Sequence, residues 1–298
     1  MNEVEPARTI VTCHDLDAFR IVLEKGNAPS AKASVRTPLK MMATRGLRGL
    51  RSAAMVGCDS LVTRDELLHY RLMSEDRTPV IANGVDSVFS ASPDPAADRE
   101  AARMLGPVRS DTLEILHVGS TIPRKRIDVL LRIFAAIRAA HPIAKLVRAG
   151  GAFTADQAKL TRDLNLDQAI VVLPFVNTAT LAAIYRRAAI VLITSEREGF
   201  GLPVIEALAC GSPVIASDLA VLREVGGSVA HFVPLGDVTA WTSLALRLIR
   251  ERLDDPDRCN ERQIEAIAQS AKFSWSEYAR RYVELYQQVA ASAGNASA

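Results

Sequence analysis

The sequence EGFGLPVIEALACG, at residues 198–211, decides the fold class of this chain. The apolar run just before it, AIVLIT at residues 189–194, is rich in β-branched side chains and is typical of a buried strand. Gly199 and Gly201 favour a tight loop because glycine accepts positive φ, and Pro203 suits the first position of a helix. The stretch therefore predicts a strand, a glycine loop and the N-terminus of a helix that runs to about residue 210.

This arrangement suits a ligand that carries both phosphate and hydroxyl groups. Ligands bind outside the carboxyl ends of parallel strands, and the unpaired N–H groups of a first helical turn attract anions. Glu206, one turn into the helix, can accept hydrogen bonds from ribose or sugar hydroxyls, and Glu198 lies in the loop. Each acid alone is better explained by a solvated position, in the loop for Glu198 and at the start of the helix for Glu206. The two acids, the glycines and the helix start together favour a sugar diphosphate.

Strands and helices alternate on both sides of this stretch, which predicts an α/β fold with a doubly wound parallel sheet. A nucleotide base is expected near Val176, just past a strand end. The strand candidates are residues 113–118, 145–149, 170–173, 189–194, 214–216 and 230–233, and the segments between and after them predicted as helices are residues 127–140, 155–164, 179–187, 203–210, 219–225 and 238–252.

The N-terminal part of the sequence contains fewer predicted strands. Residues 9–13, 59–63 and 79–82 are strand candidates, and SASPDPAAD at residues 90–98 is typical of a linker. We therefore expect a partial N-terminal lobe, a nucleotide-sugar-binding lobe and a closing helix that packs back on the first lobe and ends in a loose tail. The expected bounds are residues 1–95, 96–272 and 273–298.

The pair Glu198 and Glu206 resembles the E-x7-E donor motif of family 4 glycosyltransferases, which have the GT-B fold. Three further segments resemble parts of that family in the same order along the chain. They are ILHVGSTIPRKRIDVLL at residues 115–131 (first strand of the C-terminal lobe, phosphate loop and helix), NGVD at residues 83–86 (inter-domain segment), and FSW at residues 273–275 with residues 282–286 (closing helix).

The resemblance implies a GT-B type fold with a doubly wound, Rossmann-like C-terminal lobe. The chain departs from the family in its first lobe: two lobes of comparable size are typical of the family, whereas we expect here a partial Rossmann-like N-terminal lobe that lacks its first strand and glycine-rich loop. The implied activity is retaining transfer of a hexose from a UDP-, GDP- or ADP-sugar to a glycan or lipid-linked hydroxyl, in polysaccharide or glycolipid synthesis. No further cofactor is expected. A nucleotide-sugar-binding fragment that needs a partner chain, and a sugar nucleotide epimerase of the same fold, remain alternatives.

The resemblance also implies roles for single residues. Lys125 holds the donor phosphates with Arg124 beside it, and His14 faces the donor sugar, although a structural histidine explains His14 equally well. Many family members carry arginine where this chain has Ser120, so one phosphate contact is lost or passes to Arg124. The catalytic set is Glu198, Lys125 and His14, and the donor-binding set is Ser120, Arg124, Lys125, Val176, Glu198, Gly199, Phe200, Gly201, Leu202 and Glu206.

Composition restricts the other classes of function. The 298 residues carry a net charge of +2 and 5% aromatic residues, which argues against nucleic-acid binding. The four cysteines form no C-x-x-C pair, which suits a reducing cytosol. The sequence Asp15-Leu16-Asp17 matches the D-x-D metal motif of the other glycosyltransferase fold, but nothing around it supports that fold, so no metal site is expected. We see no apolar leader and no apolar run of about 18 residues, so a cytoplasmic protein is expected.

Six cations lie between Lys32 and Arg51 with no acid among them, and leucine and methionine are interleaved. This pattern predicts a basic amphipathic helix, which can lie on an anionic membrane surface. Peripheral contact with the inner face of the membrane would suit a lipid-linked acceptor. The alternative is a solvated helix face packed against a sheet.

Overall fold

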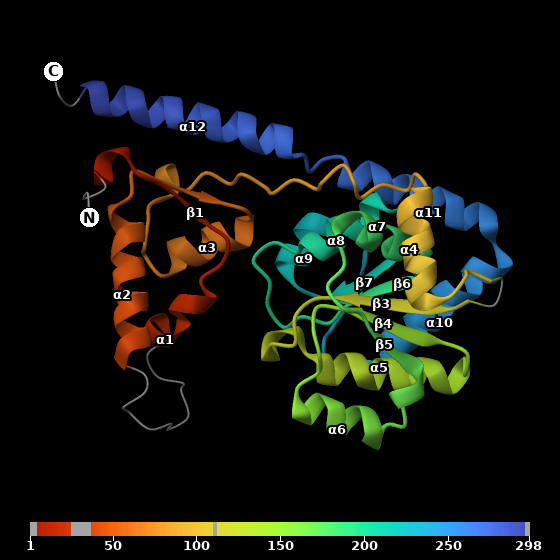
Figure 1. Cartoon of the computed structure of the whole chain (residues 1–298). Helices are drawn as coiled ribbons and strands as arrows, with labels where there is room; N and C mark the ends of the chain where they lie inside the picture. The colour runs from red at the N-terminus through yellow and green to blue at the C-terminus, as the bar shows by residue number, and fades with distance from the viewer. Residues whose placement is uncertain (1–4, 25–36, 110–111, 296–298) are drawn as a thin grey trace. The chain divides into compact units, whose positions relative to one another are not determined.

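A computed structural model describes residues 5–24, 37–109 and 112–295 of the chain (Figure 1). The chain divides into two compact units. The first comprises Met1–Gly84 and Trp275–Ala298, and the second comprises Val85–Ser274.

The second unit is built on one parallel sheet with strand order β5-β4-β3-β6-β7-β8. The order reverses between β3 and β6, which makes this a doubly wound sheet with its switch point there. The prediction of such a sheet is confirmed. Its strands are β3 (Glu114–Val118), β4 (Lys145–Ala149), β5 (Ile170–Val172), β6 (Ile190–Ile193), β7 (Val214–Ser217) and β8 (His231–Val233).

Helices cover both faces of this sheet (Figure 1). Helices α5, α6 and α10 contact one another on one side, and α4, α7, α8, α9 and α11 form a contacting series on the other. On the first side Phe134 and Trp241 pack against Ile115 and Ile190 of the sheet in one buried cluster. The bounds are α4 (Pro95–Leu105), α5 (Ile127–Ala140), α6 (Ala155–Asp163), α7 (Thr178–Arg187), α8 (Leu202–Ala209), α9 (Ala220–Gly226), α10 (Val238–Asp254) and α11 (Pro256–Ser270).

The first unit has a two-stranded parallel sheet, in which Cys13 of β1 and Cys58 of β2 are register partners. Its long helix α12 packs on this sheet, where the Tyr282 hydroxyl lies 2.9 Å from the Thr12 hydroxyl. The elements of this unit are β1 (Ile10–Cys13), α1 (Arg20–Leu23), α2 (Thr37–Ser52), β2 (Met55–Cys58), α3 (Leu61–His69) and α12 (Trp275–Asn295).

The predicted strand at residues 59–63 is wrong. Ser60 is the N-cap of α3, because its hydroxyl accepts a hydrogen bond from the Thr63 N–H at 3.1 Å. The strand lies just before this cap, in β2. Residues 79–82 form only an isolated bridge at Val80 to Cys58.

The proline-rich segment at residues 90–98 belongs to the second unit and is not an open linker. The Asp94 carboxylate caps α4 by accepting hydrogen bonds from Ala96 N and Ala97 N at 2.9 and 3.1 Å. Arg186 of α7 then pairs with Asp98 of α4 at 2.7 Å. The division of the chain accordingly follows Gly84, earlier than the expected boundary after residue 95.

The basic segment at residues 32–51 is a helix over its described part, α2, and Lys32 and Arg36 lie outside the described residues. Within the described ranges, no helix is both long and apolar enough to cross a membrane.

Candidate functional site

Two loops meet at the switch point of the second unit's sheet. One follows β3 and contains Arg124 and Lys125, and the other follows β6. Glu196 N donates to the carbonyl of Arg124 at 2.7 Å, and the Thr194 hydroxyl donates to the carbonyl of Lys125 at 3.0 Å. These bonds fix the two cations beside the glycine loop of the predicted donor motif.

The carboxylate of Glu198 is the centre of this meeting point. It accepts hydrogen bonds from Lys125 Nζ at 2.5 Å, from Arg124 at 2.9 Å and from the Ser195 hydroxyl at 2.6 Å. The Glu198 side chain is only 7% exposed. We call these four residues the Glu198 cluster. The structure therefore brings together three of the predicted residues, and it adds Ser195, which the sequence analysis missed.

The glycine loop ends at Gly201, where α8 begins. Gly201 has φ +105°, and a Cβ atom there would lie 2.7 Å from Leu222 Cδ2, so only glycine fits without strain. No side chain caps α8, so its first amides face the loop. The Phe200 ring is buried edge-to-face against Phe273 at 5.8 Å between centroids; it anchors the loop from inside.

Glu206 lies within α8, and its hydrogen-bond partner lies outside the Glu198 cluster. Its carboxylate accepts a hydrogen bond from the Tyr185 hydroxyl at 2.8 Å. Burial raises the pKa of Glu206, while the bond from Tyr185 acts in the opposite direction.

The other predicted donor residues are spread along the same edge of the sheet. Ser120 is exposed directly after Gly119, and Leu202 is 39% exposed at the start of α8. Val176 follows β5, and β4 lies between β5 and β3, so Val176 is one strand further from the Lys125 loop. Its neighbour Phe175 is 98% exposed.

A buried polar pair lies beneath the loop that follows β3. His117 and Arg148 are register partners on β3 and β4 and are 1% and 0% exposed. Burial lowers the pKa of His117 to about 3, with further lowering by the charges of Arg148 and Lys125. Neither residue is among the predicted site residues, because each stands inside a predicted strand.

The predicted residue His14 belongs to the first unit. It directly follows β1, as Asp59 follows β2, and parallel pairing brings the two side by side. His14 Nδ1 lies 3.1 Å from Asp59 Oδ2, and the Asp59 side chain is 2% exposed. Asn83 Nδ2 and the Thr63 hydroxyl also donate to this carboxylate, at 3.2 and 3.3 Å.

Asp59 is not among the predicted site residues, because it falls inside the strand predicted at residues 59–63. A serine directly before a helical pattern was the available signal, since Ser60 marks a helix start. Asp15 and Asp17 of the D-x-D sequence serve local structure: Asp15 accepts from Asp17 N at 3.0 Å, and Asp17 accepts from Arg20 at 2.9 Å. Among the described residues, no group of three or more His, Cys, Asp or Glu side chains is arranged to hold a metal.

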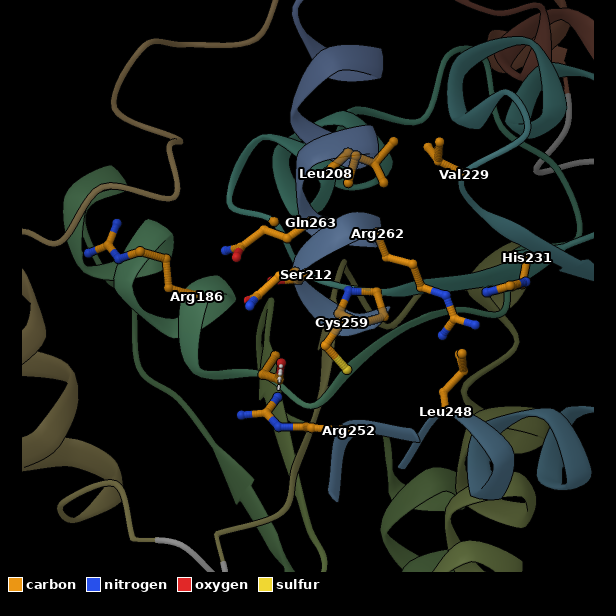
Figure 2. A pocket seen from close by; sticks show the side chains of 15 residues that line it. Arg186, Leu208, Ser212, Val229, His231, Leu248, Arg252, Cys259, Arg262 and Gln263 are labelled. Carbon is orange, nitrogen blue, oxygen red and sulfur yellow. Dashed lines mark hydrogen bonds between the residues drawn. The ribbon is translucent and has the colours of Figure 1, made fainter. Parts of the chain in front are cut away.

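A separate cavity of about 280 Å³ lies between α7, α8, α10 and α11, and Figure 2 shows its lining. None of the predicted donor residues lines it. Its arginines include Arg186 and Arg262, which pair with Asp98 and Glu251. Their charges are thereby balanced, and this cavity is distinct from the site at the Glu198 cluster.

The fold and the loop geometry define an α/β protein in which two loops meet at the switch point of a parallel sheet, the place where proteins of this architecture bind ligands. Residues 98–266, more than half of the chain, match the family described as "Glycosyl transferases group 1". The chain therefore belongs to this family.

Two relatives named D-inositol 3-phosphate glycosyltransferase show the extent of the sequence similarity. The one from Thermobispora bispora is 31% identical over 234 residues, which cover 74% of this chain and 53% of the relative. The one from Mycolicibacterium smegmatis is 28% identical over 279 residues, which cover 89% of this chain and 58% of the relative. The chain thus spans about half the length of the curated relatives it matches.

Solved structures share the fold. Sucrose-phosphate synthase from Thermosynechococcus elongatus superposes with a TM-score of 0.73 at 24% identity, covering 96% of this chain and 68% of that one. Anabaena HepE, solved in complex with UDP and glucose, gives 0.71 at 18% identity and covers 93% and 71%. These likenesses confirm the predicted α/β, GT-B type fold.

Proposed function

We propose that the chain is a retaining glycosyltransferase that moves a hexose from a nucleoside diphosphate sugar to an acceptor hydroxyl. The observation that carries the proposal is the Glu198 cluster. It places two cations and one carboxylate at the N-terminus of a helix, outside the carboxyl ends of the strands where the sheet order reverses. A diphosphate and a sugar hydroxyl are the two groups that such a set of side chains can bind together.

In this proposal the phosphates bind to Lys125, Arg124 and the first amides of α8. Lysine acts as a point charge on the developing diphosphate. Glu198 and the backbone of Gly199–Gly201 hold the sugar. Glu206 holds the ribose through the carboxylate oxygen that does not accept the Tyr185 bond. The exposed ring of Phe175, next to Val176, offers an apolar surface for a base, which suits a UDP-, GDP- or ADP-sugar.

Retention is taken from the resemblance to family 4 enzymes. The leaving phosphate oxygen accepts the proton of the acceptor hydroxyl, so the scheme needs no dedicated base and no metal. In this proposal His14 forms a hydrogen bond with the acceptor hydroxyl. The Asp59 carboxylate can only accept hydrogen bonds when ionised, so it holds a proton on His14 Nδ1 and leaves Nε2 as an acceptor for a hydroxyl.

The acceptor is proposed as a glycan or a lipid-linked sugar. The names of the relatives add D-inositol 3-phosphate to the acceptors worth testing. A fragment that binds the donor but needs a partner chain for turnover stays as the alternative, as does an epimerase. An epimerase is separated by product that forms from the nucleotide sugar with no acceptor present.

We also propose that α2 contacts an anionic membrane. One face packs inward through Ala43, Leu47 and Leu50. The remaining face exposes apolar and basic side chains together, which suits the interface of an anionic bilayer. These side chains are Leu39, Met41 and Met42, which are 57%, 59% and 70% exposed, with Lys40, Arg45, Arg48 and Arg51.

Sedimentation with vesicles of phosphatidylcholine and phosphatidylserine tests the membrane contact. Each cation near such a surface contributes about 1 kcal/mol. Arg48→Glu removes a cation and adds an anion, about 2 kcal/mol together, so it should weaken binding roughly thirtyfold. Arg250→Glu changes the same charge at an exposed position of α10 and should bind like the wild type. Equal sedimentation with uncharged vesicles would contradict the proposal.

Transfer itself is tested by NMR of the anomeric proton of the product. Each of the three nucleotide sugars is incubated with an acceptor panel, and the wild type is compared with Lys125→Ala and Lys159→Ala. Lys159 pairs with Asp163 on the exposed surface of α6, so its variant is the control. We expect an α-linked product from an α-linked donor in the wild type and control only. An inverted product, or equal turnover by Lys125→Ala, would contradict the mechanism.

A further inference from the structure

Arg148 is a fully buried cation whose guanidinium faces the loop after β3. It donates to the carbonyl of Gly119 at 2.8 Å and to the carbonyl of Gly151 at 3.4 Å. Both carbonyls lie just past the carboxyl ends of β3 and β4, the edge that carries Lys125. Arg148 is 0% exposed, although it is charged.

No described carboxylate pairs with Arg148, whose guanidinium instead lies over the Phe153 ring, 5.3 Å from the ring centroid. Its Nε atom has no hydrogen-bond partner, and neither does Nδ1 of the adjacent His117. Arg187, a second buried arginine of the same unit, differs in this respect: it donates twice to the Glu114 carboxylate, both times at 2.6 Å. Burying a charge without a counter-charge costs several kcal/mol, so Arg148 calls for an explanation that Arg187 does not.

The orientation of one peptide group indicates where the balancing charge belongs. In a trans peptide the C=O and the next N–H point in opposite directions. Because the Gly119 carbonyl points inward at Arg148, the Ser120 N–H points outward to the face of the loop. Arg148 therefore orients one anion-binding amide and adds its own positive potential beneath it.

Lys125 lies on the same loop and close to Gly119. A Cβ atom at Gly119 would meet His117 Cε1 at 3.3 Å and Lys125 Cε at 3.6 Å. The backbone of Gly119 thus lies between the buried polar pair and the lysine. An anion on the outer face of this loop would be attracted by Lys125 directly and by Arg148 through the low-dielectric interior.

We propose that Arg148 supplies, from beneath the loop, positive charge that attracts the donor diphosphate to the Ser120 amide. This inference rests on the proposed function of the loop as the donor site. It makes Arg148 a positioning and electrostatic residue that acts through the Ser120 amide, without touching the donor.

Two substitutions separate the charge of Arg148 from its hydrogen bond. Arg148→Gln removes the charge and keeps a donor for the Gly119 carbonyl, and Arg148→Lys keeps the charge. Arg138→Met is the control, because Arg138 also donates to a carbonyl of the second unit, that of Ala144 at 2.6 Å, but this carbonyl precedes β4 at the opposite edge of the sheet. The ligands are inorganic pyrophosphate and UDP, titrated calorimetrically at low and high salt.

We expect Arg148→Gln to weaken both ligands on the order of tenfold at low salt, as one charge at moderate distance requires. Arg148→Lys should stay within about threefold of the wild type, and Arg138→Met should not change affinity. The melting temperature without ligand, measured in parallel, shows that each variant is folded. If the role of Arg148 were purely structural, both Arg148 variants would have a lower melting temperature. The two variants would then bind each ligand with the same affinity.

Equal affinity of the wild type and a folded Arg148→Gln overturns the inference and leaves the donor site intact. A wild type that binds neither pyrophosphate nor any of the UDP, GDP and ADP series overturns the proposed function itself. Should Arg148→Gln fail to fold, a loss of affinity in folded Arg148→Lys equal to that of Lys125→Ala would overturn the role of the charge.

Discussion

Lys125 Nζ donates a hydrogen bond to Glu198 Oε1 at 2.5 Å, across 73 positions of sequence. Both side chains are largely buried, at 12% and 7% exposed. Glu198 therefore acts as an internal counter-ion that holds Lys125 and Arg124 in place. A donor that brings its own negative charge must share these cations with Glu198, and this competition leads to the first prediction.

Replacing Glu198 with glutamine should separate nucleotide binding from transfer. Glu198→Gln keeps the shape of the side chain but removes the anion that competes for Lys125 and Arg124. We expect UDP, GDP or ADP, whichever the wild type binds, to bind to the variant at least as tightly as to the wild type. The rate of transfer should fall by two orders of magnitude or more, because the sugar loses its carboxylate partner. Calorimetry and turnover are measured on the same preparation. Parallel losses of affinity and turnover would contradict this assignment.

Replacing Gly201 with alanine should destabilise the second unit. The residue would be forced to φ +105° with its Cβ 2.7 Å from Leu222 Cδ2, which costs about 1–3 kcal/mol. Gly49→Ala in α2 is the matched control, because its Cβ would meet nothing within 4 Å and alanine favours a helix by about 1 kcal/mol. Urea unfolding should show opposite signs for the two variants. A neutral Gly201→Ala would show that the loop is not constrained as described.

Asp59 should make the protein less stable as pH rises from about 4 to about 6. Burial raises the pKa of Asp59 from 3.8 to about 6, against the lowering effect of the bonds from His14, Thr63 and Asn83. Because the pKa of Asp59 is higher in the folded state, Asp59 adds to the free energy of unfolding at a pH below its pKa in the unfolded state. This contribution is lost as the pH rises through the pKa in the folded state. The change corresponds to roughly 3 kcal/mol. Asp59→Asn does not titrate, so the wild type should lose about this much relative to it between pH 4 and 7 in urea unfolding. A constant difference would contradict the raised pKa.

Asp59 should act on transfer only through His14. The variants His14→Ala, Asp59→Asn and the double variant form a cycle in kcat/KM. If Asp59 serves to hold the His14 tautomer, the double variant should be no slower than His14→Ala alone. Losses that simply add would mean that Asp59 acts on transfer independently of His14.

Metal removal should leave donor binding unchanged. Lys125 and Arg124 supply the positive charge in this account, so EDTA should alter the dissociation constant for the nucleotide sugar by less than about twofold. The control is the same titration with added Mg²⁺ or Mn²⁺. Binding that appears only with metal would show that the donor's charge is neutralised in another way.

The elements of the second unit could be predicted from sequence because their signals are local. Apolar runs such as residues 189–194 and the helical spacing of residues 127–140 correspond to β6 and α5. Alternation of strand and helix then predicts a parallel sheet. Because the crossover connections between parallel strands are right-handed, such a sheet is typically doubly wound with helices on both faces. The glycine loop and the start of α8 could likewise be predicted, because Gly199, Gly201 and Pro203 lie close together in the sequence.

The missed features depend on distance in sequence or on a local ambiguity. That Glu198 binds both cations follows from β3 and β6 being neighbours in the sheet. Arg148 looked like an interior strand residue, since only the path of the Gly119 loop shows what its guanidinium faces. At Asp59 the β-branched residues after Ser60 suggested a strand, but the serine cap and the helical period of α3 prevailed.

The most direct test of the central claim, that the Glu198 cluster is a donor site, is a thermal-shift series with UDP-, GDP- and ADP-glucose. A ligand at 100 times its dissociation constant stabilises by about 2.7 kcal/mol, which is roughly 5–10 °C for a unit of this size. We predict such a shift with one of the three donors in the wild type and in Lys159→Ala, and a much smaller shift in Lys125→Ala. No shift with any donor, or an equal shift in Lys125→Ala, would contradict the account.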